Sequence, residues 1–427
     1  MRVLKRNPWL VSLGALLAMT MATARVASAD ASADRGGSII VFPKVISDGT
    51  RDTLIQISNI NNTVVFAHCM YLDASPEIPG LPVGPLNPRR CQERDFTLTL
   101  TRQQPTVWRV STGRLLNNFD QVTGACTTVT VPPINGIDRQ TCPGIDPGNV
   151  INVGTLFEGH LLCVQTDSSG SPVGGDALKG EAIIESVAAA GLDGLISAYN
   201  AVSISQGTDG PNADSVLQLD GLEYAQCPDA VRFTHLAEGV PDPVVPAVTT
   251  TTELTLVPCT IDYETQTPPQ VTLQFGVWDD TELFQSTTAT LDCWFNEDLS
   301  DIGSLWNPLR STTYQTQVRP STGLRCRGGN PDTEFQFCTN DDQCDGGLCL
   351  PSSGVLGVAE TFRVLDTGAL TGSSAINLHN IGTRVSDTIF LQTGILGVCD
   401  GGANAGNPCT GDMECAPDGT CVPADQN

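Results

Sequence analysis

Cysteine is the residue type in this sequence whose number and spacing point most clearly to chemistry. The chain contains 16 cysteines, and two stretches repeat a four-cysteine pattern: residues 326–349 read Cx11Cx5Cx4C and residues 399–421 read Cx9Cx5Cx5C. Closely spaced thiols either form disulfides or bind a metal as thiolates. The residues between them are rich in Gly, Asn, Asp and Pro and bury little apolar surface, so we expect cross-links to hold these stretches in shape.

Disulfides are the favoured state of these thiols, with structural zinc as the alternative. The number of cysteines is even, the tight CxxC spacing of many zinc sites is absent, and all four histidines lie outside both units. The candidate disulfide cysteines are Cys69, Cys91, Cys126, Cys142, Cys163, Cys227, Cys259, Cys293, Cys326, Cys338, Cys344, Cys349, Cys399, Cys409, Cys415 and Cys421.

The pairing of the cysteines does not follow from their spacing, because four cysteines allow three connectivities within each unit. Outside the units we expect partners that are neighbours along the chain. These pairs are Cys69–Cys91, Cys126–Cys142, Cys163–Cys227 and Cys259–Cys293.

The first 29 residues predict a secretory signal peptide. Three basic residues, Arg2, Lys5 and Arg6, precede an apolar run over residues 9–21, and Ala-Ser-Ala at 27–29 is a small-residue cleavage site. No later segment approaches the roughly 18 apolar residues that a membrane helix needs. We therefore expect an exported chain with no membrane span, in an oxidising compartment that suits disulfides.

The chain is strongly acidic, with a formal net charge of −25. Removal of the predicted signal peptide, with its four basic residues, takes the charge from −25 to −29. Such a surface repels nucleic acid and anionic lipid, and it suits solubility, cation binding or contact with a basic partner. A solvated acidic exterior is the simplest interpretation.

Short alternating or β-branched runs predict an all-β fold. Turn residues separate the runs, and only 16% of all residues are charged, a pattern that favours antiparallel β-sandwiches. The best helical candidate is residues 181–195, which also fits a strand followed by a loop. The predicted strands are residues 38–46, 52–59, 63–72, 95–101, 161–166, 252–261, 270–278, 288–295, 359–365 and 387–392.

The length and a proline-rich stretch predict two tandem, related, immunoglobulin-like sandwich domains. Three prolines and a threonine run make residues 239–252 an extended connector. The predicted divisions are a signal peptide at 1–29, a first domain at 37–238 with a cysteine-bearing insertion, the linker at 239–252, a second domain at 253–396 with a Cys-rich insertion at 326–349, and a Cys-rich tail at 397–427.

An internal repeat supports the two-domain prediction. Features recur in the same order on both sides of the connector: a strand leading to a cysteine, an Arg-x-Ser-Thr-Gly motif, a cysteine-bearing insertion, a Gly-containing strand pair and an SAxN tetrapeptide. The motif occurs at residues 109–113 and 319–323, and the tetrapeptide at 197–200 and 374–377.

Polar groups suggest two weak binding sites. Arg109 and Arg319, each followed by Ser and Thr, could bind a carboxylate or sulfate, although such a group more often ties a strand end to a loop. Acidic turns in the Cys-rich units suggest calcium, but they lack the DxDxDG loop, and Asx turns that bind no metal are the favoured explanation. The candidate calcium ligands are Asp341, Asp342, Asp345, Asp400 and Asp412.

Sequence signatures of hydrolases are absent. The chain has no GxSxG, HExxH or SxxK motif and no glycine-rich phosphate loop before a helix. A Ser/His/Asp site would have to be assembled in space from one of His68, His160, His235 and His379. We expect no resident cofactor other than a possible calcium ion.

The two cysteine units resemble repeats of pattern CxGGxNxGxxC, followed by an acidic stretch and two more cysteines, in large secreted proteins of environmental and myxobacteria-like bacteria. The similarity covers residues 326–349 and 399–421, and the first unit has a longer opening loop. This resemblance implies export and modular construction, and it implies no activity. The sandwiches are similar to immunoglobulin-like surface modules only in a general way.

These observations favour a non-catalytic exported or cell-surface protein. In this hypothesis, sandwiches form a scaffold whose stapled loops contact an extracellular protein or glycan. One alternative is a calcium-dependent adhesin or glycan-binding module. The other is a secreted hydrolase whose catalytic residues come together only in space.

Overall fold

A computed structural model describes most of the chain after residue 30. The described residues are 31–84, 86–114, 129–130, 140–141, 147, 150–186, 195–242, 245–264, 266, 271–320, 324–327, 338–346, 348–351, 353–365, 367, 370–391, 397–400, 408–409 and 420–423. The predicted signal peptide, Cys126, Cys142, Asp412 and Cys415 lie outside these residues. The predictions made for them therefore stay predictions.

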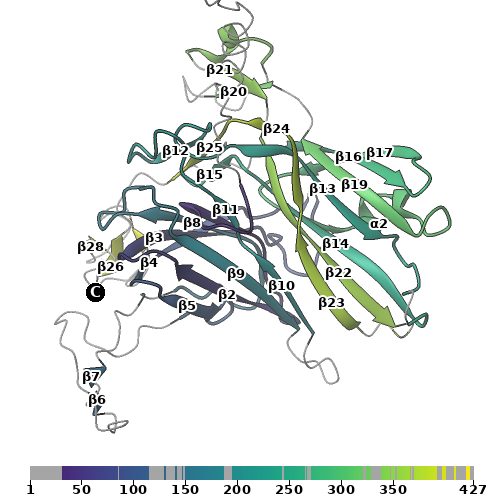
Figure 1. Ribbon diagram of the computed structural model, residues 1–427, viewed down its shortest axis with the longest axis horizontal. Helices are drawn as coiled ribbons and strands as arrows, with labels where there is room; N and C mark the ends of the chain where they lie inside the picture. Colours follow the sequence, from purple (N-terminus) through teal and green to yellow (C-terminus); the bar gives the residue numbers. More distant parts are fainter. Residues whose placement is uncertain are drawn as a thin grey trace, which may run out of the picture.

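The fold is all-β, and its strands pair almost entirely in antiparallel sheets, as the alternating runs predict (Figure 1). The largest sheet has nine strands in the order β10-β9-β2-β1-β8-β3-β4, with β11 paired to β1 and β5 paired to β2. Its strands are β1 (Ile39–Ser47), β2 (Arg51–Asn59), β3 (Val65–Asp73), β4 (Gln92–Leu100), β5 (Pro105–Arg109), β8 (Phe157–Thr166), β9 (Leu178–Ser186), β10 (Ile196–Asn200) and β11 (Val202–Ile204).

Strand β1 is buried on both faces, because one core lies on each side of it. Ile40 and Phe42 point into a core enclosed by the nine-stranded sheet, whereas Ile39 and Val41 point into a second core on the opposite face. All nine positions of β1 are buried. A strand covered on both faces is apolar at successive positions instead of alternating, which explains the run Ile-Ile-Val-Phe at its start.

Two further sheets pack face to face around a third core. The five-stranded sheet has the order β17-β16-β19-β13-β24 and the four-stranded sheet the order β18-β14-β22-β23. Apolar side chains of both sheets fill the space between them, among them Phe233, Leu254 and Phe275. The strands are β13 (Cys227–Leu236), β14 (Val248–Pro258), β16 (Val271–Asp279), β17 (Phe284–Leu291), β18 (Phe295–Asp298), β19 (Thr313–Pro320), β22 (Val355–Leu365), β23 (Leu370–Asn377) and β24 (His379–Val385).

The second core joins the two halves of the chain. It contains residues from the first half, such as Ile39 and Leu162, together with Tyr263, Trp294 and Leu356 from the second half. A small sheet in the order β12-β25-β15 contributes to the same core and links distant parts of the chain. Its strands are β12 (Val216–Leu219), β25 (Asp387–Phe390) and β15 (Ile261–Asp262).

The predicted boundary between the domains is wrong in its position. Residues 227–236, which were expected in the first domain, form β13 and pair with β19 and β24. Residues 248–252, which were expected in the linker, begin β14 and pair with β22. Proline and threonine marked an extended chain correctly, but the threonines pair with another strand, and local composition cannot reveal such a partner.

The remaining elements are short. One of them is a cysteine-bearing hairpin outside the main sheets. It consists of β20 (Leu324–Arg327), the 3-10 turn η2 (Asp341–Cys344) and β21 (Leu348–Pro351). This hairpin lies beyond the end of the five-stranded sheet (Figure 1). The other short elements are β6 (Val129–Thr130), β7 (Gln140–Thr141), β26 (Gly397–Asp400), β27 (Pro408–Cys409), β28 (Thr420–Pro423), helix α2 (Leu299–Ile302) and 3-10 turn η1 (Ser304–Trp306).

Helical structure is scarce, and none of the helices in the described residues is long and apolar enough to cross a membrane. Of the helical candidate at residues 181–195, positions 181–186 belong to β9, which is the strand alternative. The run at 288–295, predicted as one strand, is interrupted between β17 and β18. Cys293, Trp294 and Phe295 are buried in succession, which an alternating strand with one exposed face cannot achieve.

Candidate functional site

Five disulfides join cysteines of the described residues, and three of them differ from the expected pairs. The bridges are Cys69–Cys163, Cys91–Cys293, Cys227–Cys259, Cys326–Cys344 and Cys338–Cys349. The expected pairs Cys69–Cys91, Cys163–Cys227 and Cys259–Cys293 are therefore wrong. These bridges indicate an oxidising environment for the folded chain.

Strand pairing explains the corrected bridges. Cys69 on β3 and Cys163 on β8 lie directly opposite each other in the sheet, with Cα atoms 4.0 Å apart. Cys91, directly before β4, joins Cys293 over a sequence separation of 202 residues. This bridge links the two halves covalently. A pairing rule based on proximity in the sequence could not predict it.

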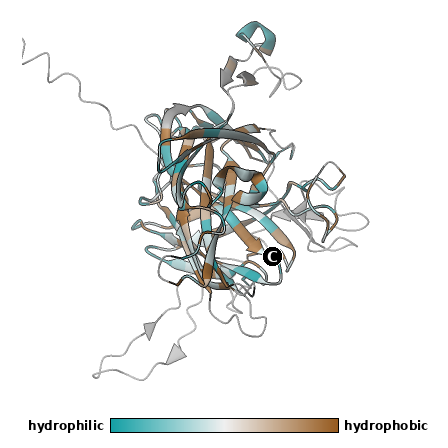
Figure 2. Ribbon diagram, turned by 90° about the vertical axis from the view of Figure 1, so that its right-hand side faces the viewer, coloured by the Kyte–Doolittle hydropathy of each residue, from teal (hydrophilic) through white to brown (hydrophobic). Residues whose placement is uncertain are grey.

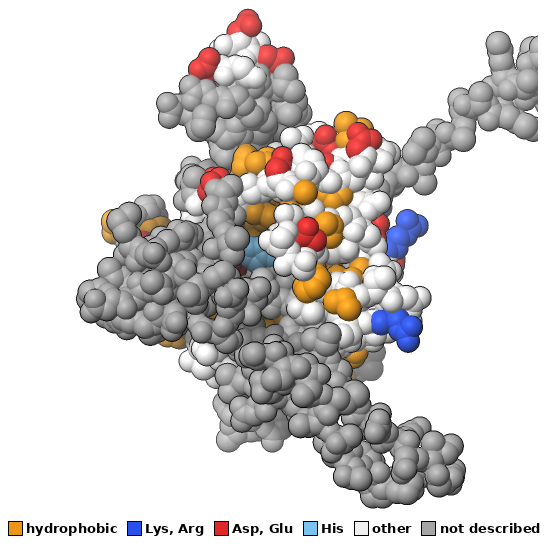
Figure 3. Space-filling view, turned by 90° about the vertical axis from the view of Figure 1, so that its left-hand side faces the viewer, with side chains coloured by type: hydrophobic (Ala, Val, Ile, Leu, Met, Phe, Trp, Pro, Cys, Tyr) orange, Lys and Arg blue, Asp and Glu red, His pale blue; other side chains and the backbone are white. Residues whose placement is uncertain are grey.

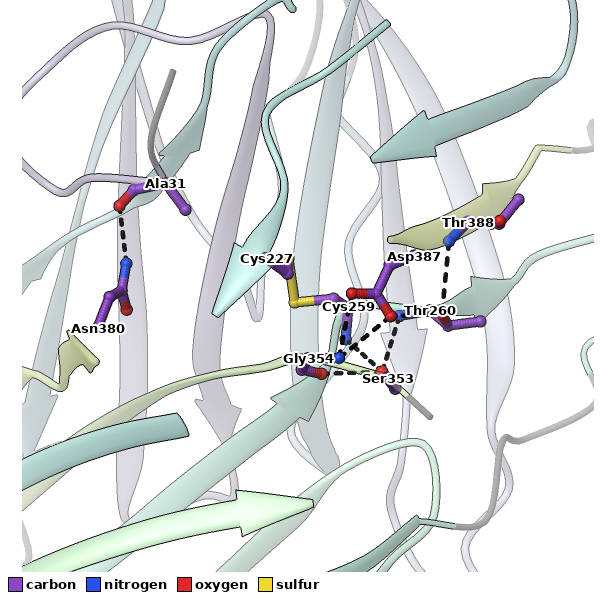
Figure 4. The surroundings of a disulfide bond; sticks show 9 residues. All are labelled: Ala31, Cys227, Cys259, Thr260, Ser353, Gly354, Asn380, Asp387 and Thr388. Atoms are coloured by element: carbon purple, nitrogen blue, oxygen red, sulfur yellow. Dashed lines mark hydrogen bonds between the residues drawn. A yellow bond between two sulfur atoms is a disulfide. The ribbon is translucent and has the colours of Figure 1, made fainter. Parts of the chain in front are cut away.

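The Cys227–Cys259 bridge lies beside a buried network of hydrogen bonds around Asp387 and Ser353 (Figure 4). The Asp387 carboxylate accepts a hydrogen bond from Thr260 Oγ1 at 2.8 Å and from the amide of Gly354 at 3.1 Å. The Ser353 hydroxyl accepts from the amide of Thr260 at 3.1 Å. The two sulfurs and Asp387 are close enough to bind a metal, but the disulfide removes the thiolates that would do so.

Two disulfides hold the hairpin at residues 324–351, which we name the stapled module. Cys326, Cys338 and Cys344 form a small buried cluster, with Cys349 packed against it. This cluster contains only cysteines. Among the described residues of the module, the cross-links therefore take the place of an apolar core, as the sequence predicts.

Among the described residues, the aspartates of the stapled module belong to no group of three close metal-binding side chains. Asp341, Asp342 and Asp345 are exposed, and the Asp341 carboxylate accepts a hydrogen bond from the amide of Cys349 at 2.7 Å. In the part of the chain that the structure describes, two such groups exist. One consists of Cys326, Cys338 and Cys344, and the other of Cys227, Cys259 and Asp387. The structure thus favours the turn-forming role for Asp341.

The tail places its outer cysteines opposite each other. Strand β26 pairs with β28 so that Cys399 faces Cys421, and Asp400 faces Thr420, in the backbone register. Strand β27 adds Cys409 opposite Gly397.

The two motif arginines lie on strands with different surroundings, because among the described strands β5 pairs only with β2, whereas β19 lies between β16 and β13. Arg109 on β5 pairs with Leu54 of β2, and Arg319 on β19 pairs with Gln274 of β16. The Arg109 guanidinium lies 2.5 Å from the carboxylate of Glu185 on β9. Arg109 thus has an acidic partner on β9, which pairs with the same strand β2, and this favours the strand-tying role. Residues 321–323, which complete the second motif, lie outside the described ones.

The four histidines lie apart from one another. His68 on β3 contacts Asp95 on the adjacent strand β4 at 2.8 Å. His235 contacts the Thr316 hydroxyl at 2.9 Å. Burial lowers the pKa of His235 to about 4. His379 is exposed on β24.

A buried cluster of charges lies where the halves meet, and the sequence analysis did not single it out. Lys44, on β1, has a side chain with no exposed surface, and its Nζ lies 2.6 Å from Glu253 Oε2 on β14 and 2.7 Å from Glu360 Oε2 on β22. Arg51 on β2 contacts the same Glu253 oxygen at 2.8 Å. We name these residues the Lys44 cluster.

Electrostatics keeps Glu253 ionised despite its burial. Desolvation alone would raise the pKa of its carboxyl group, but the charges of Lys44 and Arg51 outweigh this effect and lower the pKa well below its usual value. Burial of ions is costly unless each has a close partner of opposite charge. The cluster therefore stabilises one relative position of the two halves.

Polar side chains surround the ions. The Ser197 hydroxyl on β10 donates a short hydrogen bond to Glu360 Oε1. On the other side, the Asn296 amide on β18 donates to Glu253 Oε1, and the Thr255 hydroxyl donates to Asn296 Oδ1. A signal existed in the sequence, because Lys44 is the one charged residue in the run at 38–46.

A second buried polar group lies on the face that meets the second core. His160 on β8 and Glu93 on β4 both pair with Leu72 of β3, so their side chains share one face of the sheet. The His160 ring contacts the Tyr263 hydroxyl at 3.1 Å, and burial lowers its pKa to about 3. Both carboxylate oxygens of Glu93 are buried without a hydrogen-bond partner.

Comparisons with known proteins place this chain in no family. No family model and no curated protein matches it. Among solved structures, the naturally empty top component of cowpea mosaic virus is 9% identical with a TM-score of 0.15, covering 92% of this chain and 98% of that one. Tripeptidyl peptidase 2 is 7% identical with a TM-score of 0.13, covering 81% and 28%. Scores this low carry no argument about fold or function.

Proposed function

We propose that this chain is an exported, non-catalytic scaffold that presents the stapled module to an extracellular protein or glycan. The carrying observation is the contrast between a cross-linked body and a separately cross-linked appendage. The body contains the Cys91–Cys293 bridge and the Lys44 cluster between its halves. The module has its own two bridges and projects beyond the sheets (Figures 1 and 2).

The exposed chemistry of the module supports a basic partner. Asp341, Asp342 and Asp345 are all exposed at its turn, and acidic side chains appear at the tip of the module in Figure 3. The chain as a whole carries a net charge of −25. Complementary charge accelerates association and selects partners.

A binding experiment tests this role. Poly-L-lysine is the probe for a basic surface, and interferometry compares the wild-type chain with the triple variant Asp341→Asn, Asp342→Asn, Asp345→Asn at several salt concentrations. The triple variant should bind at least several-fold more weakly, because its charges lie together on one projecting surface.

A matched control separates the module from the general acidity of the protein. The control variant neutralises three exposed acidic residues of the body, Asp34, Asp209 and Glu282. Equal loss of binding in both variants would reject the module as the contact surface. Binding that EDTA abolishes would favour the calcium-dependent alternative, and cleavage of a glycan or protein substrate would favour the hydrolase.

Export by the predicted signal peptide is part of the proposal. The disulfides support an oxidising destination, and N-terminal sequencing of the secreted protein should begin at Asp30. A product that still begins at Met1 would contradict this route.

We also propose that the two halves are related repeats of an immunoglobulin-like unit. In support, Ser197 pairs with Ile184 and Ser374 pairs with Thr361. In each half, the first residue of the SAxN tetrapeptide therefore pairs with the residue 13 positions before it (197 − 184 and 374 − 361). The Asn377 amide donates a 2.8 Å hydrogen bond to the Asn200 carbonyl. The last residues of the two tetrapeptides therefore meet at the contact between the halves.

A further inference from the structure

The Lys44 cluster holds an amine next to a primary amide. Lys44 Nζ donates to Glu253 Oε2 at 2.6 Å, and the Asn296 amide donates to the other oxygen of the same carboxylate. The two oxygens of a carboxylate share one carbon atom. The Lys44 amine and the Asn296 amide thus each donate to one oxygen of the same Glu253 carboxylate.

We propose that Lys44 and Asn296 react with each other to form an intramolecular isopeptide bond between the two halves of the chain. This inference goes beyond the display role and does not depend on it. Lys44 lies on β1 and Asn296 on β18, so the bond would fasten the first half to the second. It would act next to the Cys91–Cys293 bridge, which connects the same parts of the chain.

Glu360 is the base of this reaction. The Lys44 amine must lose a proton before it can act as a nucleophile. Glu360 Oε2 lies 2.7 Å from Lys44 Nζ, whereas Arg51 is 3.9 Å from it. Glu253, in contrast, contacts Arg51 at 2.8 Å and stays ionised. Glu360 therefore accepts the proton, while Glu253 positions the amide.

Thr255 activates the electrophile. Its hydroxyl donates a short hydrogen bond to Asn296 Oδ1, the oxygen that becomes negative when an amine adds to the amide carbon. A donor placed on the developing oxyanion lowers the barrier, most strongly in a site with little water. The fully buried side chain of Lys44 also limits competing hydrolysis.

The atoms balance without a further reactant. Glu360 takes one proton from the Lys44 ammonium group, and the neutral Nζ bonds to the Asn296 side-chain carbon. Glu360 then gives this proton to the nitrogen of the old amide, whose carbon–nitrogen bond breaks to release ammonia, and Glu360 takes the second proton of the new nitrogen. Glu360 returns its proton to the ammonia, so the products are a secondary amide, an ammonium ion and two carboxylates.

Peptide mass spectrometry of the wild-type protein tests this proposal directly. The reduced, alkylated and denatured chain is digested with trypsin and a protease that cuts after glutamate. The expected product joins peptide 36–51, uncut at Lys44, to peptide 283–297, which contains Asn296 but neither Glu253 nor Glu360. Its mass is lower than the sum of the two peptides by one ammonia, about 17 Da.

The same digest can overturn the proposal without any variant. Quantitative cleavage after Lys44, together with unmodified peptide 283–297, would mean that no bond forms. A loss of water instead of ammonia, or fragments that place the link on another residue, would reject Asn296 as the acceptor.

Variants identify the roles of the residues. Asn296→Leu and Glu360→Gln should each abolish the linked peptide, whereas Asn377→Leu, which alters an amide on β23, should leave it intact. Formation of the Cys91–Cys293 bridge in each variant shows that the halves still assemble. A linked peptide of wild-type abundance in Glu360→Gln would reject the assigned base.

Discussion

Glu93 offers a sharp test of the electrostatics inside the fold. Its carboxylate oxygens are buried and unpartnered, and burial, with a smaller effect of Asp95, raises its pKa from 4.5 to about 9. The folded chain therefore keeps a proton on Glu93 that the unfolded chain has already lost above pH 4.5. Because the folded state binds more protons, the free energy of unfolding must fall as pH rises through this window.

The magnitude follows from one proton. A difference of one bound proton changes the free energy of unfolding by about 1.4 kcal/mol per pH unit, so stability should fall by about 2 kcal/mol between pH 7 and 8.5. Among the other groups with large shifts, His160 titrates at about 3 and His235 at about 4, and the buried tyrosines have pKa values raised above their usual range. Glu238, at about 7, contributes only at the lower end of the range from pH 7 to 8.5. The difference in slope between the wild type and Glu93→Gln therefore isolates Glu93.

Urea unfolding without reductant, at a series of pH values, measures this slope. The variant Glu93→Gln cannot ionise, so its stability should be nearly independent of pH in this range, and it should exceed that of the wild type at pH 8.5. Glu77→Gln, at an exposed position, should keep the wild-type slope. An equal slope in the wild type and Glu93→Gln would refute the reasoning.

Three further predictions concern the connections between strands and halves. Replacing Cys91 and Cys293 with alanine should lower the free energy of unfolding by about 5 kcal/mol in the chain-entropy estimate, as measured with denaturant. Trp294→Phe removes the indole hydrogen bond to a backbone carbonyl and should cost about 1 kcal/mol in the same assay. Gly357→Ala would place a Cβ 2.5 Å from a backbone oxygen and should lower the melting temperature, whereas Gly84→Ala, with open space around it, should not.

The fold class could be predicted from the sequence because strand patterns are local. The runs at 52–59 and 270–278 match β2 and β16 within one residue at each end, since alternating burial leaves a clear signature. The run Ile39–Phe42 also identified a strand, although both of its faces are buried. Partners could not be predicted in the same way. Pairing of β13 with β19 depends on residues far apart in the chain, and no short-range pattern encodes it.

The candidate site shows the same limit more strongly. The two-bridge module was foreseen because its cysteines lie within one short segment. The Lys44 cluster draws Lys44 from one half and Glu253 and Glu360 from the other, so Lys44 lies 209 residues before its partner Glu253. A lysine within an apolar run indicates a buried charge, but only the structure identifies its partners.

The connections between the halves also bear on why the chain has two sets of disulfides. A scaffold holds its shape only if its two halves do not separate, and an apolar contact alone can open when the chain is pulled. Here the second core, the Cys91–Cys293 bridge and the Lys44 cluster all act across the same contact. The described part of the module, in contrast, has the bridges Cys326–Cys344 and Cys338–Cys349 at its centre in place of an apolar core. Reduction should therefore unfold the module first, because the apolar cores and the buried ions still hold the body together. This order of unfolding would show that the body is stabilised by its interior and that the module depends on its disulfides.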